Sequence, residues 1–250
     1  MRNKLIAIMV LVVAGLVFAQ SEPTVGKPAP RQHRGFYNSS SFGLGYNWYK
    51  SSKKDEDYSR HDNDKWMDVD YFKFKGYSFP VFEFKFGTAL ANLVAFHTVF
   101  NMGFYSGTME SRFESVYYTC KGEDFCVKDD SKHEYEDYGS NAAFGFRNYL
   151  GFGSTVYPFR DKVPVMEGFF VGGSVGYSLF ATFINNSEGD EAAFNFGLSY
   201  QFEIGKEWWV NDHLSLGFGL GYARTNLSSK TKSSYSTDNV LSLSFRMTRG

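Results

Sequence analysis

The chain has 250 residues, of which 43% are hydrophobic and 19% aromatic, and its formal net charge at pH 7 is −1. This near-neutral balance gives no basis for a nucleic-acid partner. The 27 phenylalanines, 17 tyrosines and 4 tryptophans exceed what the core of a soluble domain of this size needs.

The first 19 residues are typical of a secretory signal peptide, which is removed from the mature protein. Arg2 and Lys4 precede the apolar run LIAIMVLVVAGLVFA, and the small residues Val17 and Ala19 stand at the two positions that a signal peptidase reads. A membrane-spanning helix would need roughly 20 apolar residues, which is more than this run provides. We therefore predict cleavage after Ala19, which leaves 24 basic and 27 acidic residues.

Residues 20–35 are predicted to form a flexible periplasmic leader. The stretch QSEPTVGKPAPRQHR holds three of the chain's six prolines and has no apolar periodicity. The remaining residues, 36–250, are compatible in length with a single β domain.

From residue 36 onward, segments of alternating hydrophobicity follow one another, and no helical periodicity interrupts them. Pro80 stands inside the second segment, where it removes a ladder donor, so we expect a bulge or break near it. The segments predict eight strands, at about 36–49, 68–87, 93–109, 139–157, 165–182, 192–205, 213–226 and 238–248.

The stretch LSLGFGLGYA, residues 214–223, indicates what these strands face. Side chains of a strand alternate between its two sides, so Phe218 and Leu220 share one face while Gly217 and Gly219 share the other. In a soluble sandwich the outward face would carry Lys, Glu or Thr rather than glycine. A face of small residues suits a narrow, crowded barrel lumen, with the large residues turned outward to lipid.

The connections between the expected strands alternate in length without exception. Those after the first, third, fifth and seventh strands are polar and mostly long, whereas the others are short: TALAN, PFRDKVP and KEWWVND. Outer-membrane barrels show this alternation because one rim has short periplasmic turns and the other has longer extracellular loops. An even strand number then places both termini in the periplasm.

The last strand, NVLSLSF, looks like the terminal signal that the barrel-assembly machinery reads, with Asn239, Leu243 and Phe245 as its polar, apolar and aromatic positions. With the strand pattern, it makes the chain resemble the small outer-membrane β-barrels of the OmpA and OmpX type. Two departures are Val240, where glycine is usual, and the extra residues RMTRG after Phe245.

This resemblance implies an all-β fold, an eight-stranded antiparallel up-and-down transmembrane β-barrel, although ten strands remain an alternative. It also implies an integral protein of the bacterial outer membrane, with outer-membrane lipid and the assembly machinery as partners, and it leaves room for an extracellular ligand at the loops.

Strand parity collects polar side chains on the inward faces, and eight strands leave an interior only just wide enough for them. Charges confined there need partners, and Glu83 and Glu203 are the acids that this set offers to Arg147 and Arg246. Lys75, Tyr149 and Gln201 fall on the same faces. We therefore expect a filled lumen rather than an open pore, built on a polar network of Lys73, Glu83, Lys85, His97, Arg147, Glu203 and Arg246.

Two further groups of residues carry structural expectations. Trp48, Trp66, Trp208 and Trp209 fall near strand ends, where an aromatic girdle would lie. Cys120 and Cys126, the only cysteines of an exported chain, are predicted to form a disulfide across a small loop. They lie within residues 110–137, whose nine acids and four bases suit either solubility or contact with a cation-dependent or basic partner.

The sequence gives little sign of catalysis. The histidines have no zinc spacing, the acidic stretch around Asp55 lacks the EF-hand order, and no serine lies at short spacing from His97. We expect no enzyme activity, no metal and no cofactor. The leading interpretation is a non-enzymatic structural or surface-contact role through extracellular loops. The alternatives are a narrow channel or transporter for small or hydrophobic molecules and, less favoured, a lipid-modifying enzyme.

Overall fold

The computed structural model describes residues 32–58, 65–120, 126–129, 134–159, 164–186, 189–227 and 235–249. The expected signal peptide and most of the leader lie outside these ranges. No helix in the described residues is long and apolar enough to cross a membrane. The elements are β1 (Gly35–Tyr58), β2 (Lys65–Leu90), β3 (Val94–Cys120), β4 (Cys126–Lys128), β5 (Glu134–Val156), the 3-10 turn η3 (Pro164–Met166), β6 (Phe169–Asn186), β7 (Gly189–Trp209), β8 (Leu214–Leu227) and β9 (Tyr235–Arg249).

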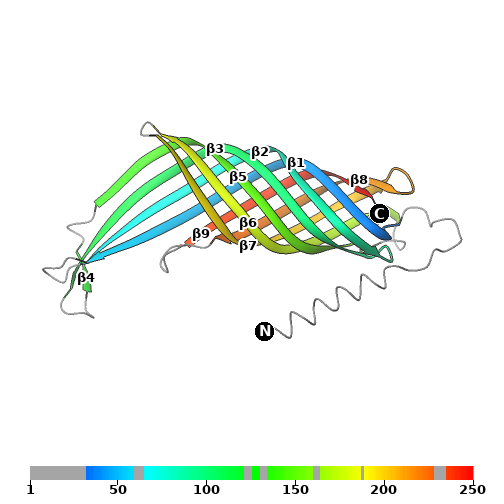
Figure 1. Cartoon of the computed structure of the whole chain (residues 1–250), viewed down its shortest axis with the longest axis horizontal. Helices are drawn as coiled ribbons and strands as arrows, with labels where there is room; N and C mark the ends of the chain where they lie inside the picture. Colours follow the sequence, from blue (N-terminus) through cyan, green and yellow to red (C-terminus); the bar gives the residue numbers. More distant parts are fainter. Residues whose placement is uncertain are drawn as a thin grey trace.

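The strands close into a barrel (Figure 1). Each long strand pairs antiparallel with the next along the chain, and β1 pairs with both β2 and β9, which closes the ring. The short β4 pairs only with β3, so the other strands of the nine-stranded sheet form an eight-membered ring. The predicted eight-stranded up-and-down topology is confirmed.

Four strands extend well beyond the end of the closed barrel. β1, β2, β3 and β5 have 24, 26, 27 and 23 residues, whereas β8 and β9 have 14 and 15. The β1 ladder with β9 stops at Ser52, and the β5 ladder with β6 stops at Ala143. Beyond these points the four strands pair only with one another and with β4. We call this extension the tongue, made of residues 53–58, 65–75, 108–120, 126–128 and 134–142.

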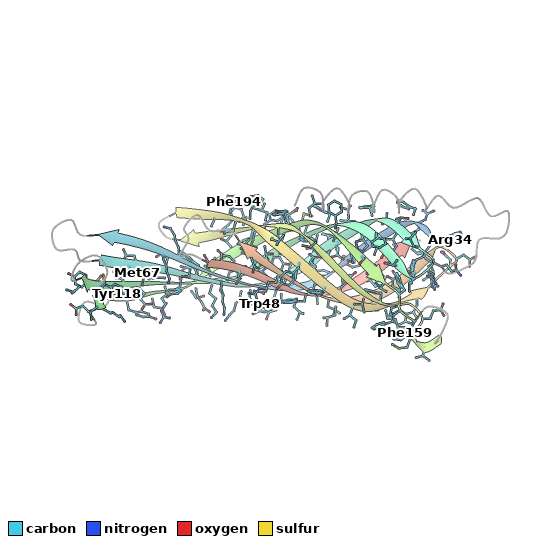
Figure 2. All side chains as sticks on the ribbon, turned by 90° about the horizontal axis from the view of Figure 1, so that it is seen from below. Arg34, Trp48, Met67, Tyr118, Phe159 and Phe194 are labelled. Carbon is cyan, nitrogen blue, oxygen red and sulfur yellow. The ribbon has the colours of Figure 1, made fainter. Side chains whose placement is uncertain are left out.

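The tongue projects far beyond one end of the barrel. Figure 2 shows Met67 and Tyr118 near its tip, and Arg34 and Phe159 at the opposite end of the molecule. The termini-side end of the barrel is fixed by the pairing of Asn38 in β1 with Arg249 in β9. The sequence placed residues 50–67 and 110–138 largely in loops. For the described residues this was wrong, because they form strands that are held by ladder hydrogen bonds. Their buried side chains, such as Val69, Val116 and Tyr117, lie among charged residues and do not alternate regularly, so the sequence shows no strand period there.

The inward and outward faces follow the predicted alternation. In β8, Ser215 and Gly217 are buried while Phe218 and Leu220 are exposed, and in β5 Phe152 is 71% exposed beside the inward Gly153. Gly172 on β6 shows why small residues are needed inside. A Cβ at this position would lie 2.3 Å from a carboxylate oxygen of Glu203.

The expected irregularity near Pro80 is present and has a consequence that strand parity did not predict. The β2–β3 register shifts between Tyr77 and Val81, and the β1–β2 register shifts between Gly43 and Gly45. Because side chains alternate with a period of two, the shift exchanges the faces of β2. Even-numbered residues such as Phe74 and Gly76 point inward before the shift, and odd-numbered residues such as Val81 and Lys85 point inward after it.

Candidate functional site

The termini-side half of the lumen is organised around Arg246, whose side chain is 2% exposed. Its Nε lies 2.9 Å from Oε1 of Glu207, and its Nη1 donates to Oε1 of Glu203 at 3.2 Å. Nη2 donates to the Tyr37 hydroxyl, and the guanidinium lies 4.2 Å from the centre of the Phe170 ring. Every face of the cation is therefore occupied by protein.

Lys85 extends this network toward the middle of the barrel. Its Nζ lies 3.0 Å from Oε1 of Glu83 and also contacts the Glu203 carboxylate. Nε2 of His97 lies 2.9 Å from the Thr155 hydroxyl, which in turn donates to Glu203 at 3.2 Å. Glu203 therefore links both cations.

Arg147 forms a separate ion pair with Asp238. Its Nε donates to Oδ2 of Asp238 at 2.8 Å, and the two side chains are 1% and 0% exposed. The remaining guanidinium hydrogens reach Asn101, Ser199 and Thr225 at 3.4, 3.1 and 3.4 Å. This pair differs from the expectation that Glu83 or Glu203 would neutralise Arg147.

Two acids of the network were missed by the sequence analysis. Asp238 lies on the same parity as Arg246 in β9, so the inward face of that strand could have identified it. Glu207 was assigned to a short turn, because the apolar Trp208 and Trp209 beside it obscured the end of the strand. β7 in fact continues through this turn to Trp209, which carries Glu207 into the lumen.

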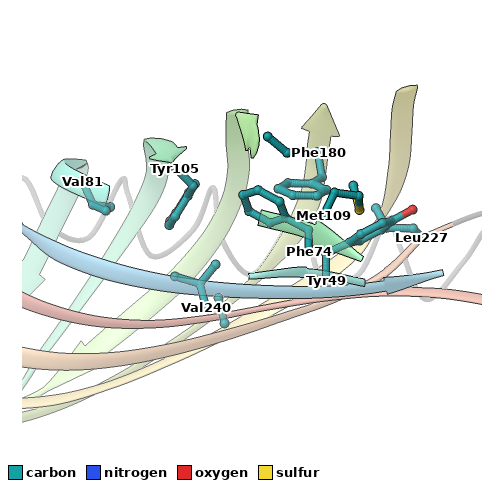
Figure 3. Close-up of a cluster of buried hydrophobic side chains, with 10 residues drawn as sticks. Tyr49, Phe74, Val81, Tyr105, Met109, Phe180, Leu227 and Val240 are labelled. Atoms are coloured by element: carbon teal, nitrogen blue, oxygen red, sulfur yellow. The ribbon is translucent and has the colours of Figure 1, made fainter. Parts of the chain in front are cut away.

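An apolar layer of buried side chains lies where the tongue joins the barrel (Figure 3). The rings of Phe74 and Phe180 are 5.9 Å apart, and Tyr49 packs against Phe180 at 5.0 Å. Met109 and Leu227 complete the same cluster. The layer covers the polar network on the side facing the tongue.

His33 closes the opposite mouth of the barrel. Its ring lies 4.4 Å from that of Tyr157 and 4.6 Å from that of Trp209, and its Nε2 lies 3.5 Å from Oε2 of Glu207. Its backbone N–H donates to Oδ1 of Asn92 at 2.9 Å, and the Asn92 N–H donates to the His33 carbonyl at 3.0 Å. The sequence placed His33 in a flexible leader, but at 3% exposure it is a fixed part of the mouth.

A small polar cavity of about 40 Å³ remains inside the barrel. Its lining includes Glu83, Lys85, His97 and Arg147, together with glycines and serines of β1, β6, β8 and β9. A buried water occupies roughly 10–15 Å³ on this measure, so the cavity has room for a few waters. Nδ1 of His97 is buried without a protein partner, which is consistent with solvation from this space.

Lys73 is the member of the expected network that the structure places elsewhere. It precedes the β2 register shift and faces outward, where its Nζ donates to Oε2 of Glu110 at 2.8 Å. Lys75 faces the same way, with its Nζ 3.6 Å from Oε1 of Glu110. The hydrogen bond raises the pKa of the Lys73 ammonium and lowers the pKa of the Glu110 carboxyl.

The three tryptophans whose side chains the structure describes lie at different places along the barrel. Trp48 lies on the outer wall 5.6 Å from the Tyr46 ring, and Trp208 is exposed on the outer wall near the termini. Trp209 instead packs against His33 at the mouth. The side chain of Trp66 lies outside the described residues.

The assembly-signal residues lie on β9, and the two cysteines lie opposite each other in the tongue tip. Asn239 accepts a hydrogen bond from the Tyr222 hydroxyl at 2.9 Å, Leu243 is exposed, and Phe245 packs on Phe218 at 5.6 Å, so all three assembly-signal residues lie on the outer wall. The backbones of Cys120 and Cys126 pair directly across the β3–β4 hairpin. Because the side chain of Cys120 lies outside the described residues, the disulfide stays a prediction.

The described residues contain no group of three or more His, Cys, Asp or Glu side chains that could hold a metal ion.

Comparison with known proteins identifies similar folds only. No protein-family model and no curated protein matches the sequence. The outer membrane protein OprG from Pseudomonas aeruginosa is 10% identical and matches 87% of this chain and 97% of its own, with a TM-score of 0.45. Neisserial surface protein A is 12% identical over 86% and 96%, with a TM-score of 0.38. The outer membrane protease OmpT from Escherichia coli is 10% identical over 89% and 99%, with a TM-score of 0.33.

At these identities and scores the likeness concerns the general architecture and not any activity. The eight-stranded barrel that the sequence resemblance implied is confirmed by the strand pairing of the structure itself.

Proposed function

We propose that the chain is an integral protein of the bacterial outer membrane whose sealed barrel holds the tongue at the cell surface as a non-enzymatic contact platform. The outer wall supports a membrane location. Large apolar side chains such as Phe152, Tyr177, Phe194 and Phe202 are exposed on it, at 59% to 71%. A soluble protein rarely exposes so continuous an apolar surface, and a closed barrel satisfies its backbone hydrogen bonds without water.

We favour a contact role over a transport role because the lumen is filled. The Arg246 and Lys85 network, the Arg147–Asp238 pair and the apolar layer around Phe180 succeed one another along the barrel axis. Each charged group is paired inside a space without room for bulk water. Moving ions through it would require breaking buried ion pairs, which costs several kcal/mol for each unpaired charge.

The tongue provides the surface for contact. Its strands are held by their own ladders and project beyond the rim opposite to the termini. Short turns lie at the rim that carries the termini, and in outer-membrane barrels that rim is periplasmic. The tongue is therefore assigned to the extracellular side.

The experiment compares the full protein with a variant in which residues 112–137 are replaced by a short Gly-Asn-Gly turn joining β3 to β5. Because the barrel ladders are retained, the variant should still migrate faster on gels before boiling than after it. We expect no steady conductance from either protein in planar bilayers and loss of cell attachment to surfaces in the variant alone. Steady conductance of the full protein would instead favour the narrow-channel alternative.

A further inference from the structure

A hollow of about 650 Å³ lies at the base of the tongue. This is within the range of pockets that take small ligands. Its lining combines cationic, acidic and aromatic side chains, chiefly Lys50, Tyr71, Lys73, Glu110, Arg112 and Tyr135. None of these belongs to the lumen network described above.

The strand register places these side chains on one face. Lys50 pairs with Lys73, and Lys73 pairs with Glu110, in one row across β1, β2 and β3. In the next row, Tyr71 pairs with Arg112. Paired residues of antiparallel strands point to the same side. Phe74 and Met109, which alternate with these residues, point into the apolar layer, so the face that bears the cations is the outer one.

The hollow has an excess of positive charge. Its lining holds the cations Lys50, Lys73 and Arg112 and the acids Glu110 and Asp137. Lys75 does not line the hollow but lies beside it, within ion-pair distance of Glu110. Lys73 and Lys75 share the single Glu110 carboxylate, at 2.8 and 3.6 Å. Lys50 has no ion-pair partner among the residues that the structure describes. An anion entering here would meet at least one cation that is not already neutralised.

The hollow also contains aromatic rings, which can pack against a sugar. The Arg112 guanidinium lies 4.3 Å from the centre of the Tyr135 ring, which holds its planar fork toward the hollow. Such a fork matches two oxygens of a phosphate. Tyr71 lines the same space, so ring faces and cations are available together, as a phosphorylated sugar requires.

The position of the hollow along the outer wall of the barrel indicates that such a ligand would come from the membrane. Trp48 pairs with Lys75, one outward row closer to the barrel than Lys50 and Lys73. Trp48 packs on Tyr46 at 5.6 Å, and Tyr46 packs on Tyr77 at 4.9 Å. Such aromatic clusters sit at the boundary between lipid and headgroups. The cations therefore begin at the level where a lipid anchored against the apolar wall would place its headgroup.

We propose that this hollow binds the phosphate-bearing sugar headgroup of a membrane glycolipid. Lys50 and Arg112 bind the phosphate, Lys75 adds charge from the barrel side, and the Tyr71 and Tyr135 rings pack on the sugar. The assignment rests on the membrane location given under Proposed function. It adds a ligand site to the contact platform and requires no opening of the lumen.

The test uses the full mature protein in phosphatidylcholine nanodiscs that also contain lipid A, a phosphorylated diglucosamine lipid. Lipid A retained after detergent extraction is measured by native mass spectrometry. Three proteins are compared: the wild type, the double variant Lys50→Gln/Arg112→Gln, and the control Lys206→Gln. Lys206 is also an outward lysine beside a tryptophan, 5.4 Å from the Trp208 ring, but it lies at the opposite end of the barrel.

We expect the double variant to bind lipid A about tenfold more weakly than the wild type, and the control to bind as the wild type does. Dephosphorylated lipid A should bind the wild type as weakly as intact lipid A binds the double variant. Equal binding of the phosphorylated and dephosphorylated lipids, or equal binding by the double variant and the wild type, would overturn the proposal.

A further arm uses the deacylated, still phosphorylated disaccharide in solution. Weaker binding of this soluble headgroup than of the lipid supports the membrane source, and binding as tight as that of the lipid would overturn it. Gel migration of each variant before and after boiling verifies that the barrel is folded. Because gel migration, conductance and cell attachment are measured separately from lipid binding, failure of the proposed function is distinguishable from failure of the lipid site.

Discussion

The lumen and the tongue use the same residue types to opposite effect. In the lumen, Arg147 and Asp238 are almost completely buried, and each has several hydrogen-bonding partners. On the tongue, Lys73 and Glu110 form a hydrogen bond of the same length, 2.8 Å, but their side chains remain 40% and 45% exposed. The distance between the two charged groups therefore does not by itself show how much an ion pair contributes to the stability of the protein. Burial determines this contribution, because removing one member of a buried pair leaves a charge that water cannot solvate.

The largest expected effect comes from breaking the buried pair. Arg147→Ala should destabilise the barrel by about 3–5 kcal/mol, because Asp238 would remain as an unpaired buried charge. Urea unfolding of the protein in detergent micelles measures the change. The double variant Arg147→Met/Asp238→Leu should lose less than Arg147→Ala alone. If Arg147→Ala were as stable as the wild type, the lumen pairs would not support the barrel.

A smaller effect is expected at the mouth of the barrel. His33→Ala removes a buried ring from between Tyr157 and Trp209 and should cost about 1–2 kcal/mol, since the backbone bonds to Asn92 remain. The same variant should make the leader more sensitive to protease in detergent. Unchanged proteolysis would mean that the ring does not fix the end of the leader.

The exposed pair of the tongue should contribute least among the ion pairs. Lys73→Gln is expected to change stability by less than about 1 kcal/mol at pH 7, because water screens the pair. Its contribution should be present between the ordinary pKa values of the two groups, 4.5 and 10.5. It should fade as pH falls through the lowered pKa of folded Glu110, and as pH rises through the raised pKa of folded Lys73.

A pH series of unfolding curves for the wild type and Lys73→Gln checks this window. The two curves should converge at both extremes. A difference that grew in acid would contradict the assigned pair.

The cysteines at the tongue tip should have no effect on the barrel. We expect a thiol reagent to label Cys120 and Cys126 on intact cells only after a reductant is added. Reduction should speed hydrogen exchange in β4 without moving the midpoint of barrel unfolding, because β4 pairs only with the far end of β3 among the described strands. Labelling without reductant would show free thiols.

The strand alternation was sufficient to predict the ring and most of its inward faces. Gly217 and Gly219 lie inside, Phe218 and Leu220 lie outside, and the chain closes with eight strands. Each of these features depends on the period of two along a single strand, which is a local property of the chain. The same reasoning did not find the tongue, because its buried side chains, such as Val69, Val116 and Tyr117, lie among charged residues and do not alternate regularly.

The pairing of the lumen charges was decided only by the tertiary structure. The sequence by itself determined which strands form and which of their faces carry charges such as Arg147 and Arg246. It could not determine that Asp238, 91 positions away, would lie beside Arg147, since this depends on the relative register of strands on different sides of the barrel. Nor could it show that the shift near Pro80 turns Lys73 outward, because a bulge is resolved only when two strands are aligned. Periodicity acts within a strand, whereas partners are set by how the closed barrel aligns one strand with another.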